Sequence, residues 1–77
     1  MPHFYFDATV NGDALPDPEG VELDTYAAAR QEALRAVAEM VKDQHLDGDT
    51  RDFTIAIREG AEPVATIRLS LKIEDAS

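Results

Sequence analysis

Hydrophobic and polar residues alternate along residues 3–10, the first segment of the chain with a clear pattern. A period of two is typical of a β-strand with one buried face. The dipeptide that follows, Asn11-Gly12, readily adopts the positive φ angles of a type I′ turn, so it predicts a tight hairpin. The apolar face of the strand consists of Phe4, Phe6, Ala8 and Val10.

The strand that returns from this turn is predicted to be short and irregular. Pro16 and Pro18 have no N–H group to donate to a strand ladder, so they belong at a sheet edge or in a loop. We expect the extended conformation to resume only around residues 21–23. We interpret the acidic residues of this region as a solvated turn with a capping aspartate; they are Asp13, Asp17, Glu19, Glu22 and Asp24.

The pattern becomes helical from Tyr26 to about His45. Asp24 or Thr25 can serve as the N-cap, because either side chain accepts a hydrogen bond from a free helix N–H group. Gly48 can end the helix in a left-handed conformation. The apolar side of the helix gathers Tyr26, Ala29, Ala33, Val37, Met40 and Val41, flanked by Leu34 and Ala36.

Alternation returns after a polar link, at residues 53–58 and 64–73, with a turn between them. The element order is therefore ββαββ. We predict a single α+β domain over residues 1–77, in which one amphipathic helix covers one face of an antiparallel sheet of three or four strands, in the order 2-1-3-4. The expected core consists of Ala33, Val37 and Met40 from the helix and Phe4, Phe6, Ile55, Ile57, Ile67, Leu69 and Leu71 from the sheet.

Charge and composition narrow the function classes. The 77 residues include 16 acidic and 7 basic ones, which gives a formal net charge of −9. Such a surface repels phosphate backbones and anionic lipids, so we expect neither nucleic-acid nor membrane partners. The chain has no cysteine for disulfides or thiolate metal sites. It shows no secretory leader pattern and no membrane-spanning stretch, and we expect a cytoplasmic protein.

The sequence contains no complete motif for a catalytic site or a metal site. The segment Asp43-x-His45-x-Asp47-Gly48 is similar to the first half of an EF-hand calcium loop, but Arg51 and Thr54 occupy later ligand positions. Neither Ser70 nor Ser77 lies in a nucleophile motif. We therefore expect no catalytic residues, no metal site, no cofactor and no enzymatic activity.

Three short motifs resemble those of a known family. They are Phe4-x-Phe6-Asp7 in the first strand, Asp17-x-x-Gly20-Val21-Glu22-Leu23 before the helix, and Ala29-x-x-x-Ala33-Leu34 within it. Together they resemble a family of short bacterial proteins that is catalogued only as a domain of unknown function. The resemblance spans nearly the whole chain and implies a stand-alone cytoplasmic domain. It implies no activity, cofactor or catalytic residue.

A looser similarity is to the HicB-type antitoxin domains. Those domains also run from strands through an acidic, glycine-containing turn to an alanine-rich helix. The present chain lacks their third strand before the helix and has no attached DNA-binding segment.

The sheet face away from the helix is the candidate contact surface. Its polar side chains form either an ordinary solvated face or a partner site, and Tyr5 is the best single anchor because aromatic residues often dominate interfaces. The strand over residues 64–73 lies at an edge in the predicted order, and an exposed edge can pair with another chain. The residues assigned to the candidate face are His3, Tyr5, Asp7, Arg58, Arg68 and Lys72.

We hypothesise a non-enzymatic interaction or regulatory module whose partner is another protein or, in a homodimer, a second copy of the chain. The alternative is a HicB-like antitoxin or inhibitor whose acidic surface covers a basic RNA-binding partner.

Overall fold

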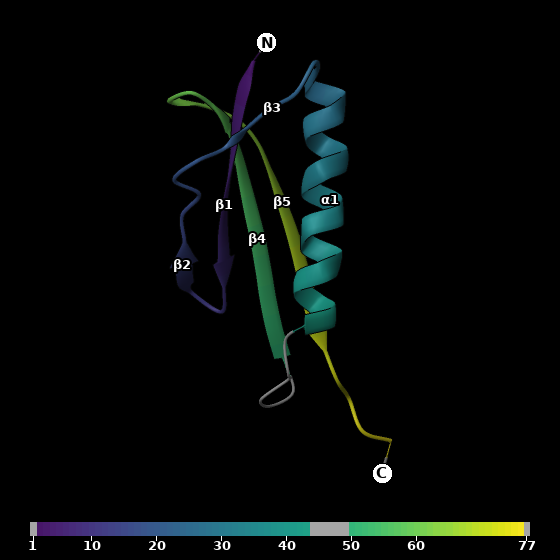
Figure 1. Cartoon of the computed structure of the whole chain (residues 1–77). Coiled ribbons are helices and arrows are strands. Elements are labelled where there is room, and N and C mark those ends of the chain that lie inside the picture. The colour runs from purple at the N-terminus through teal and green to yellow at the C-terminus, as the bar shows by residue number, and fades with distance from the viewer. Residues whose placement is uncertain (1, 44–49, 77) are drawn as a thin grey trace.

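One helix lies against a single antiparallel sheet in the computed structural model, which describes residues 2–43 and 50–76 (Figure 1). The sheet has the strand order β2-β1-β4-β5, and β3 pairs with β1 beyond the end of β2. The predicted α+β class, antiparallel sheet and strand order are thus confirmed. The elements are β1 His3–Val10, β2 Asp13–Leu15, β3 Val21–Glu22, α1 Tyr26–Asp43, β4 Thr50–Glu59 and β5 Glu62–Lys72.

The hairpin between β1 and β2 has the predicted turn. Asn11 and Gly12 have φ angles of 50° and 88°, as a type I′ turn requires. The Asn11 side chain also reaches the beginning of β4, where its Oδ1 accepts a hydrogen bond of 2.8 Å from the N–H group of Asp52. The turn is therefore fastened to the neighbouring strand as well as to its own hairpin.

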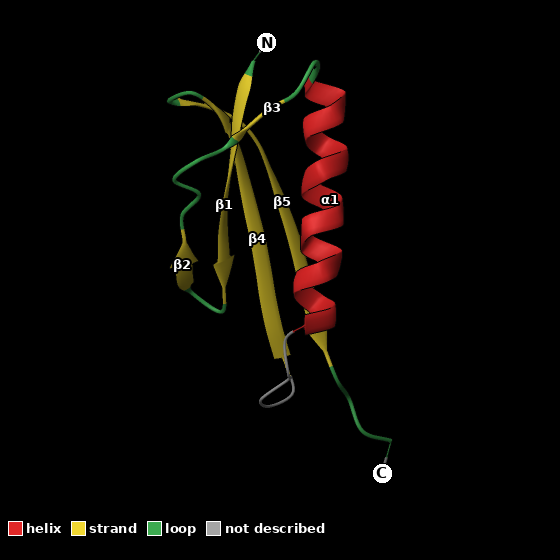
Figure 2. Cartoon of the chain, in the orientation of Figure 1, coloured by secondary structure: helices red, strands yellow, loops and turns green. Residues whose placement is uncertain are grey.

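The return strand forms in two pieces, which raises the number of strands to five. β2 is three residues long, β3 is two, and the intervening segment contains Pro16 and Pro18 (Figure 2). The predicted irregularity is confirmed, and its cause is the absence of N–H donors at the two prolines.

The helix begins where the sequence predicts. The Thr25 Oγ1 accepts a hydrogen bond of 3.1 Å from the N–H group of Ala28, so Thr25 is the N-cap. The predicted end near His45 and the proposed C-cap at Gly48 lie outside the described residues.

The core lies where α1 packs against β1 and β4, and half-buried side chains of β5 line its margin. Met40, Phe6, Ile67, Leu69 and Leu71, which the sequence assigned to the core, are only half-buried. The rest of the predicted core is buried as expected. The buried apolar side chains are Phe4, Val10, Ala29, Ala33, Val37, Phe53, Ile55 and Ile57.

Two helix residues expected on or beside the apolar face are largely exposed. Tyr26 is 43% exposed and Leu34 is 50% exposed. Tyr26 lies in the first turn, where the guanidinium carbon of Arg30 is 5.9 Å from the centre of its ring. The helix therefore turns its apolar flank partly into solvent.

We predict that Val37→Asp unfolds the domain, because it places an unpaired charge among buried apolar side chains. The cost is about 5 kcal/mol or more, comparable to the whole stability of a domain this small. Ala38→Asp is the matched control, since Ala38 is the exposed neighbour on the same helix. Thermal unfolding followed by circular dichroism measures both variants, and equal melting temperatures for the two would contradict the core assignment.

Candidate functional site

Four of the six residues predicted for the contact face lie together. The pairing of β1 with β4 places Tyr5 directly opposite Arg58. Arg58 Nε donates a hydrogen bond of 2.8 Å to Asp7 Oδ2, and the guanidinium carbon lies 4.1 Å from the centre of the Tyr5 ring. A second guanidinium nitrogen donates a bond of 2.8 Å to the carbonyl oxygen of Gly60. Arg58 is therefore held by an anion, an aromatic face and a carbonyl of its own chain.

His3 extends this group of contacts to the loop before β3. Its ring centre lies 4.9 Å from that of Tyr5, and its Nε2 is 2.7 Å from the carbonyl oxygen of Glu19. Because a carbonyl oxygen only accepts, the Nε2 atom carries the proton in this hydrogen bond.

Asp17 joins the same group, although no sequence pattern placed it on this face. Its N–H group donates a hydrogen bond of 2.9 Å to Asp7 Oδ1. The set of His3, Tyr5, Asp7, Asp17 and Arg58 is called the open-face cluster below. It ties the loop between β2 and β3 to the two central strands.

The Asp17 carboxylate also repairs the gap in the return strand. Its Oδ2 accepts a hydrogen bond of 3.1 Å from the N–H group of Phe6, on the stretch of β1 between its pairings with β2 and β3. Its Oδ1 accepts bonds of 3.2 and 3.0 Å from the N–H groups of Glu19 and Gly20. A side chain thus replaces the backbone acceptor that an uninterrupted strand would offer, which keeps these N–H groups paired.

Both carboxyl groups of the cluster are held in the ionised form. The Arg58 hydrogen bond, assisted by the Asp17 N–H group, lowers the pKa of Asp7 below its ordinary value. For Asp17, burial raises the pKa, but the hydrogen bonds from Gly20, Phe6 and Glu19 outweigh burial and the net pKa is lowered.

Gly20 is packed closely beneath the cluster. Its φ angle is 68°, and a Cβ atom at this position would lie 2.7 Å from His3 Nε2 and 2.7 Å from the carbonyl oxygen of Phe4. The glycine of the Asp17-x-x-Gly20 motif is therefore required by both backbone conformation and space.

Arg68 and Lys72, the other two predicted residues, lie on β5, apart from the cluster. Arg68 pairs with Thr54 across the ladder, and Lys72 Nζ lies 3.2 Å from Glu74 Oε1 in an exposed ion pair. The structure thus divides the predicted face into an internally bonded cluster on β1 and β4 and a basic strip on β5.

The large exposed apolar side chains lie on the helix and near the sheet edges. Leu15 and Val21 pair with Ala8 and Phe4, which places them on the helix side of the sheet at the β2–β3 edge. The remaining four lie on α1 or close to the ends of β5. These exposed side chains are Leu15, Val21, Tyr26, Leu34, Val64 and Ile73.

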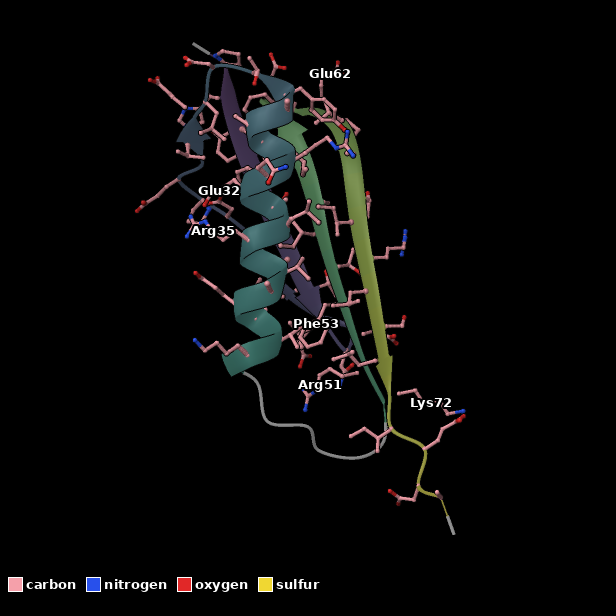
Figure 3. The ribbon with its side chains drawn as sticks, turned by 90° about the vertical axis from the view of Figure 1, so that its right-hand side faces the viewer. Glu32, Arg35, Arg51, Phe53, Glu62 and Lys72 are labelled. Atoms are coloured by element: carbon pink, nitrogen blue, oxygen red, sulfur yellow. The ribbon has the colours of Figure 1, made fainter. Side chains whose placement is uncertain are left out.

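Leu34 lies on the flank of the helix that faces β5. In Figure 3, Glu32 and Arg35 project from the helix on the side away from β5. Each residue turns an α-helix by about 100°, so Leu34 lies about 160° around the helix from Glu32. The name β5 edge surface is used below for Leu34 together with Val64, Ile67, Leu69 and Ile73.

The β5 edge surface differs in charge from the rest of the chain. Residues 63–73 include two basic residues and no acidic one, in a chain with 16 acidic residues. Two signals in the sequence pointed to this surface, namely the predicted edge position of the strand over residues 64–73 and the position of Leu34 at the margin of the apolar arc of the helix.

Over residues 2–43 and 50–76, no group of three or more His, Asp or Glu side chains is arranged to hold a metal ion. No helix in those ranges has the length and apolarity needed to cross a membrane. Most of the EF-hand-like segment at residues 43–48 lies outside the described residues.

The family model described as a domain of unknown function, DUF6894, matches residues 3–70. The chain belongs to this family. The match begins at the first residue of β1 and ends within β5, so the DUF6894 unit includes the open-face cluster and most of the β5 edge surface. No curated protein and no solved structure matches the chain. The resemblance inferred from the three sequence motifs is thus confirmed, whereas the similarity to HicB-type domains finds no support.

We predict that Gly20→Ala destabilises this DUF6894 domain more than Gly60→Ala does. Both glycines have positive φ angles, 68° and 59°, but a Cβ atom at Gly60 has no neighbour within 4 Å. Gly60→Ala is expected to cost about 1–2 kcal/mol from backbone strain. The clash at Gly20 adds about 1–3 kcal/mol. Urea unfolding of the two variants measures the difference, and equal free energies of unfolding would contradict the close packing.

We also predict that the domain loses stability in acid partly through the open-face cluster. The folded-state pKa values of Asp7 and Asp17 are lowered, so their contribution is fully present above the unfolded value of about 4. It is lost as the pH falls through the folded-state pKa values, because protons then bind and break the hydrogen bonds.

The measurement is the free energy of unfolding in urea as a function of pH, for the parent chain and for Asp17→Asn. The variant should show a shallower decline on acidification. Asp75→Asn is the control, since Asp75 is exposed beyond β5 and should leave the decline unchanged. A decline in Asp17→Asn as steep as in the parent would contradict the role of this carboxylate.

Proposed function

We propose that this DUF6894 domain is a non-enzymatic interaction or regulatory module that binds a protein partner through the β5 edge surface. The observation that carries the proposal is the state of β5. Among the described strands, this eleven-residue strand pairs with β4 alone, which leaves one row of backbone hydrogen-bonding groups available. Such edges bind an added strand through main-chain hydrogen bonds.

The apolar side chains beside this edge support the same proposal. Ile67 and Leu69 are half-buried, and Leu34 on the helix above them is 50% exposed. An added strand would complete the cover over these side chains, and apolar burial would then supplement the backbone hydrogen bonds. Arg68 and Lys72, from the predicted contact face, project from the opposite face of the same strand and would flank the partner.

The bonding of the open-face cluster supports a structural role for that cluster rather than a catalytic one. A general base must be free to accept a proton from a substrate. The Asp7 and Asp17 carboxylates instead accept fixed donors of their own chain, and His3 Nε2 donates to a carbonyl. The Tyr5 ring already contacts His3 and Arg58 of its own chain. We therefore propose that the partner binds at β5 rather than at Tyr5.

The experiment is affinity capture from a native lysate with immobilised parent chain, Leu34→Lys and Glu39→Gln. The two substitutions change the net charge equally, but Glu39 is 64% exposed and lies two residues beyond Val37 on the far side of the helix. We expect the parent and Glu39→Gln to retain a shared protein that Leu34→Lys loses. Equal retention by all three would contradict the proposal.

The same capture tests the HicB-like alternative. A HicB-like inhibitor would bind a basic partner through the acidic segment around Asp17, away from β5. Retention of a basic protein by Leu34→Lys would favour that alternative.

A further inference from the structure

We infer that the partner at the β5 edge surface is a second copy of this chain, whose β5 pairs antiparallel with the first around a two-fold axis at Ile67. The inference rests on the proposed function, because it uses the same surface. Two copies joined in this way would share one continuous sheet, with both helices on the same face of it.

The length of β5 determines this register. A strand that pairs antiparallel with its own copy overlaps over its full length only when its middle residue lies on the two-fold axis. β5 runs from Glu62 to Lys72, so that residue is Ile67. Ile67 then lies opposite its copy, and Ala65 lies opposite Leu69, which keeps apolar side chains together on the helix side.

Charge favours the same register over its neighbour. A two-fold axis at Arg68 would set two like charges directly opposite each other, which destabilises a strand pair. With the axis at Ile67, Arg68 lies opposite Thr66.

The position of the helix fits a pair of copies. α1 packs against β4 and β5, and neighbouring strands lie about 4.8 Å apart. The helix packs chiefly over β4, so its axis lies about three strand spacings, or about 14 Å, from the axis of the second helix. The two helices would therefore meet only through the side chains on the flanks that face each other.

Leu34 is a large apolar side chain that a single chain leaves 50% exposed. It lies at the middle of α1, which runs beside β5 over the same span (Figures 1 and 3). A two-fold axis at Ile67 therefore passes close to Leu34 and brings it against its copy. The pairing would bury the side chain that a single chain leaves half in solvent.

The distribution of charge permits this contact despite the net charge of −9. Two copies of so acidic a chain repel each other through most of their surface. They meet here through β5, which carries the two basic residues Arg68 and Lys72 and a single acidic one, Glu62.

Sedimentation equilibrium at micromolar concentration tests the association with purified chain. We expect a mass twice the 8.4 kDa of one chain for the parent and for Glu39→Gln. Leu34→Lys, which sets two ammonium groups against each other at the axis, should raise the Kd of the dimer by about tenfold or more. Circular dichroism checks that each variant is folded. A parent that stays at the mass of one chain, or a Leu34→Lys variant as dimeric as Glu39→Gln, would overturn the inference.

Single cysteines test the register, because the chain has none of its own. Opposed residues of an antiparallel pair have Cα atoms about 4.5–5.5 Å apart, within reach of a disulfide. Ile67→Cys should therefore form a cross-linked dimer on mild oxidation. Leu69→Cys is the control on the same face, since its copy would lie about 13 Å away along the strands. Cross-linking of Leu69→Cys equal to or greater than that of Ile67→Cys would overturn the register.

The two experiments separate this inference from the proposed function. If the purified chain is monomeric but capture still depends on Leu34, the partner is a different protein and only the present inference fails. If the chain is monomeric and capture is unchanged by Leu34→Lys, both fail.

Discussion

A single helix has to cover a sheet that is wider than the helix. An α-helix is about 10 Å across, which is roughly the width of two strands. In this domain the sheet is four strands wide at the level of β2, so the helix, which packs chiefly over β4, leaves both margins partly uncovered. The small side chains of Ala29 and Ala33, which are fully buried, allow a close approach at the centre. The narrow core and the exposed leucines and valines both follow from this ratio of widths.

The margin beyond β1 is organised differently from the margin at β5. Two prolines interrupt the return strand, and one carboxylate takes over as acceptor for the N–H groups of the strand edge and the following turn. The same aspartate is fastened to Asp7, which is held by Arg58 on the next strand. At this margin, hydrogen bonds to side chains therefore take the place of the backbone pairing found in the rest of the sheet. The opposite margin is the long strand β5, whose pairing with β4 shifts register once, and among the described residues no side chain replaces a backbone partner along it.

Most of the fold could be predicted from local sequence patterns. Alternation identified the long strands, the Asn11-Gly12 dipeptide identified the turn, and the choice of cap was limited to two adjacent residues, of which Thr25 is used. The open-face cluster could not be predicted in the same way. Whether Tyr5 and Asp7 meet Arg58 depends on the register between strands that are about fifty residues apart in the chain, and alternation gives the face but not the register. Asp17 was interpreted only as one of the acidic residues of a solvated turn, and its acceptor role towards β1 depends on how the loop folds back onto that strand.

The exposure of Leu34 could not be predicted from a helical wheel, for a related reason. The wheel gives the angle of a side chain around the helix, whereas burial depends on how far the sheet extends beneath that angle. At Leu34 the sheet ends, and the residue is left 50% exposed. All six residues assigned to the contact face lie on strands of the sheet, and four of them are bonded in one group together with Asp17, which had not been assigned.

The pairing of β1 with β4 has a consequence for the order in which the molecule can form. Phe4 lies opposite Glu59, so the first strand finds its central neighbour only after the helix and the whole of β4 are available. On a ribosome, β1 and α1 emerge with their apolar faces uncovered, and at that time β1 can pair only with the short strands β2 and β3. Contacts so distant along the chain are slow to close. The β4–β5 hairpin, in contrast, is local and can fold as soon as it is made, so the second half of the molecule is the template onto which the first half docks.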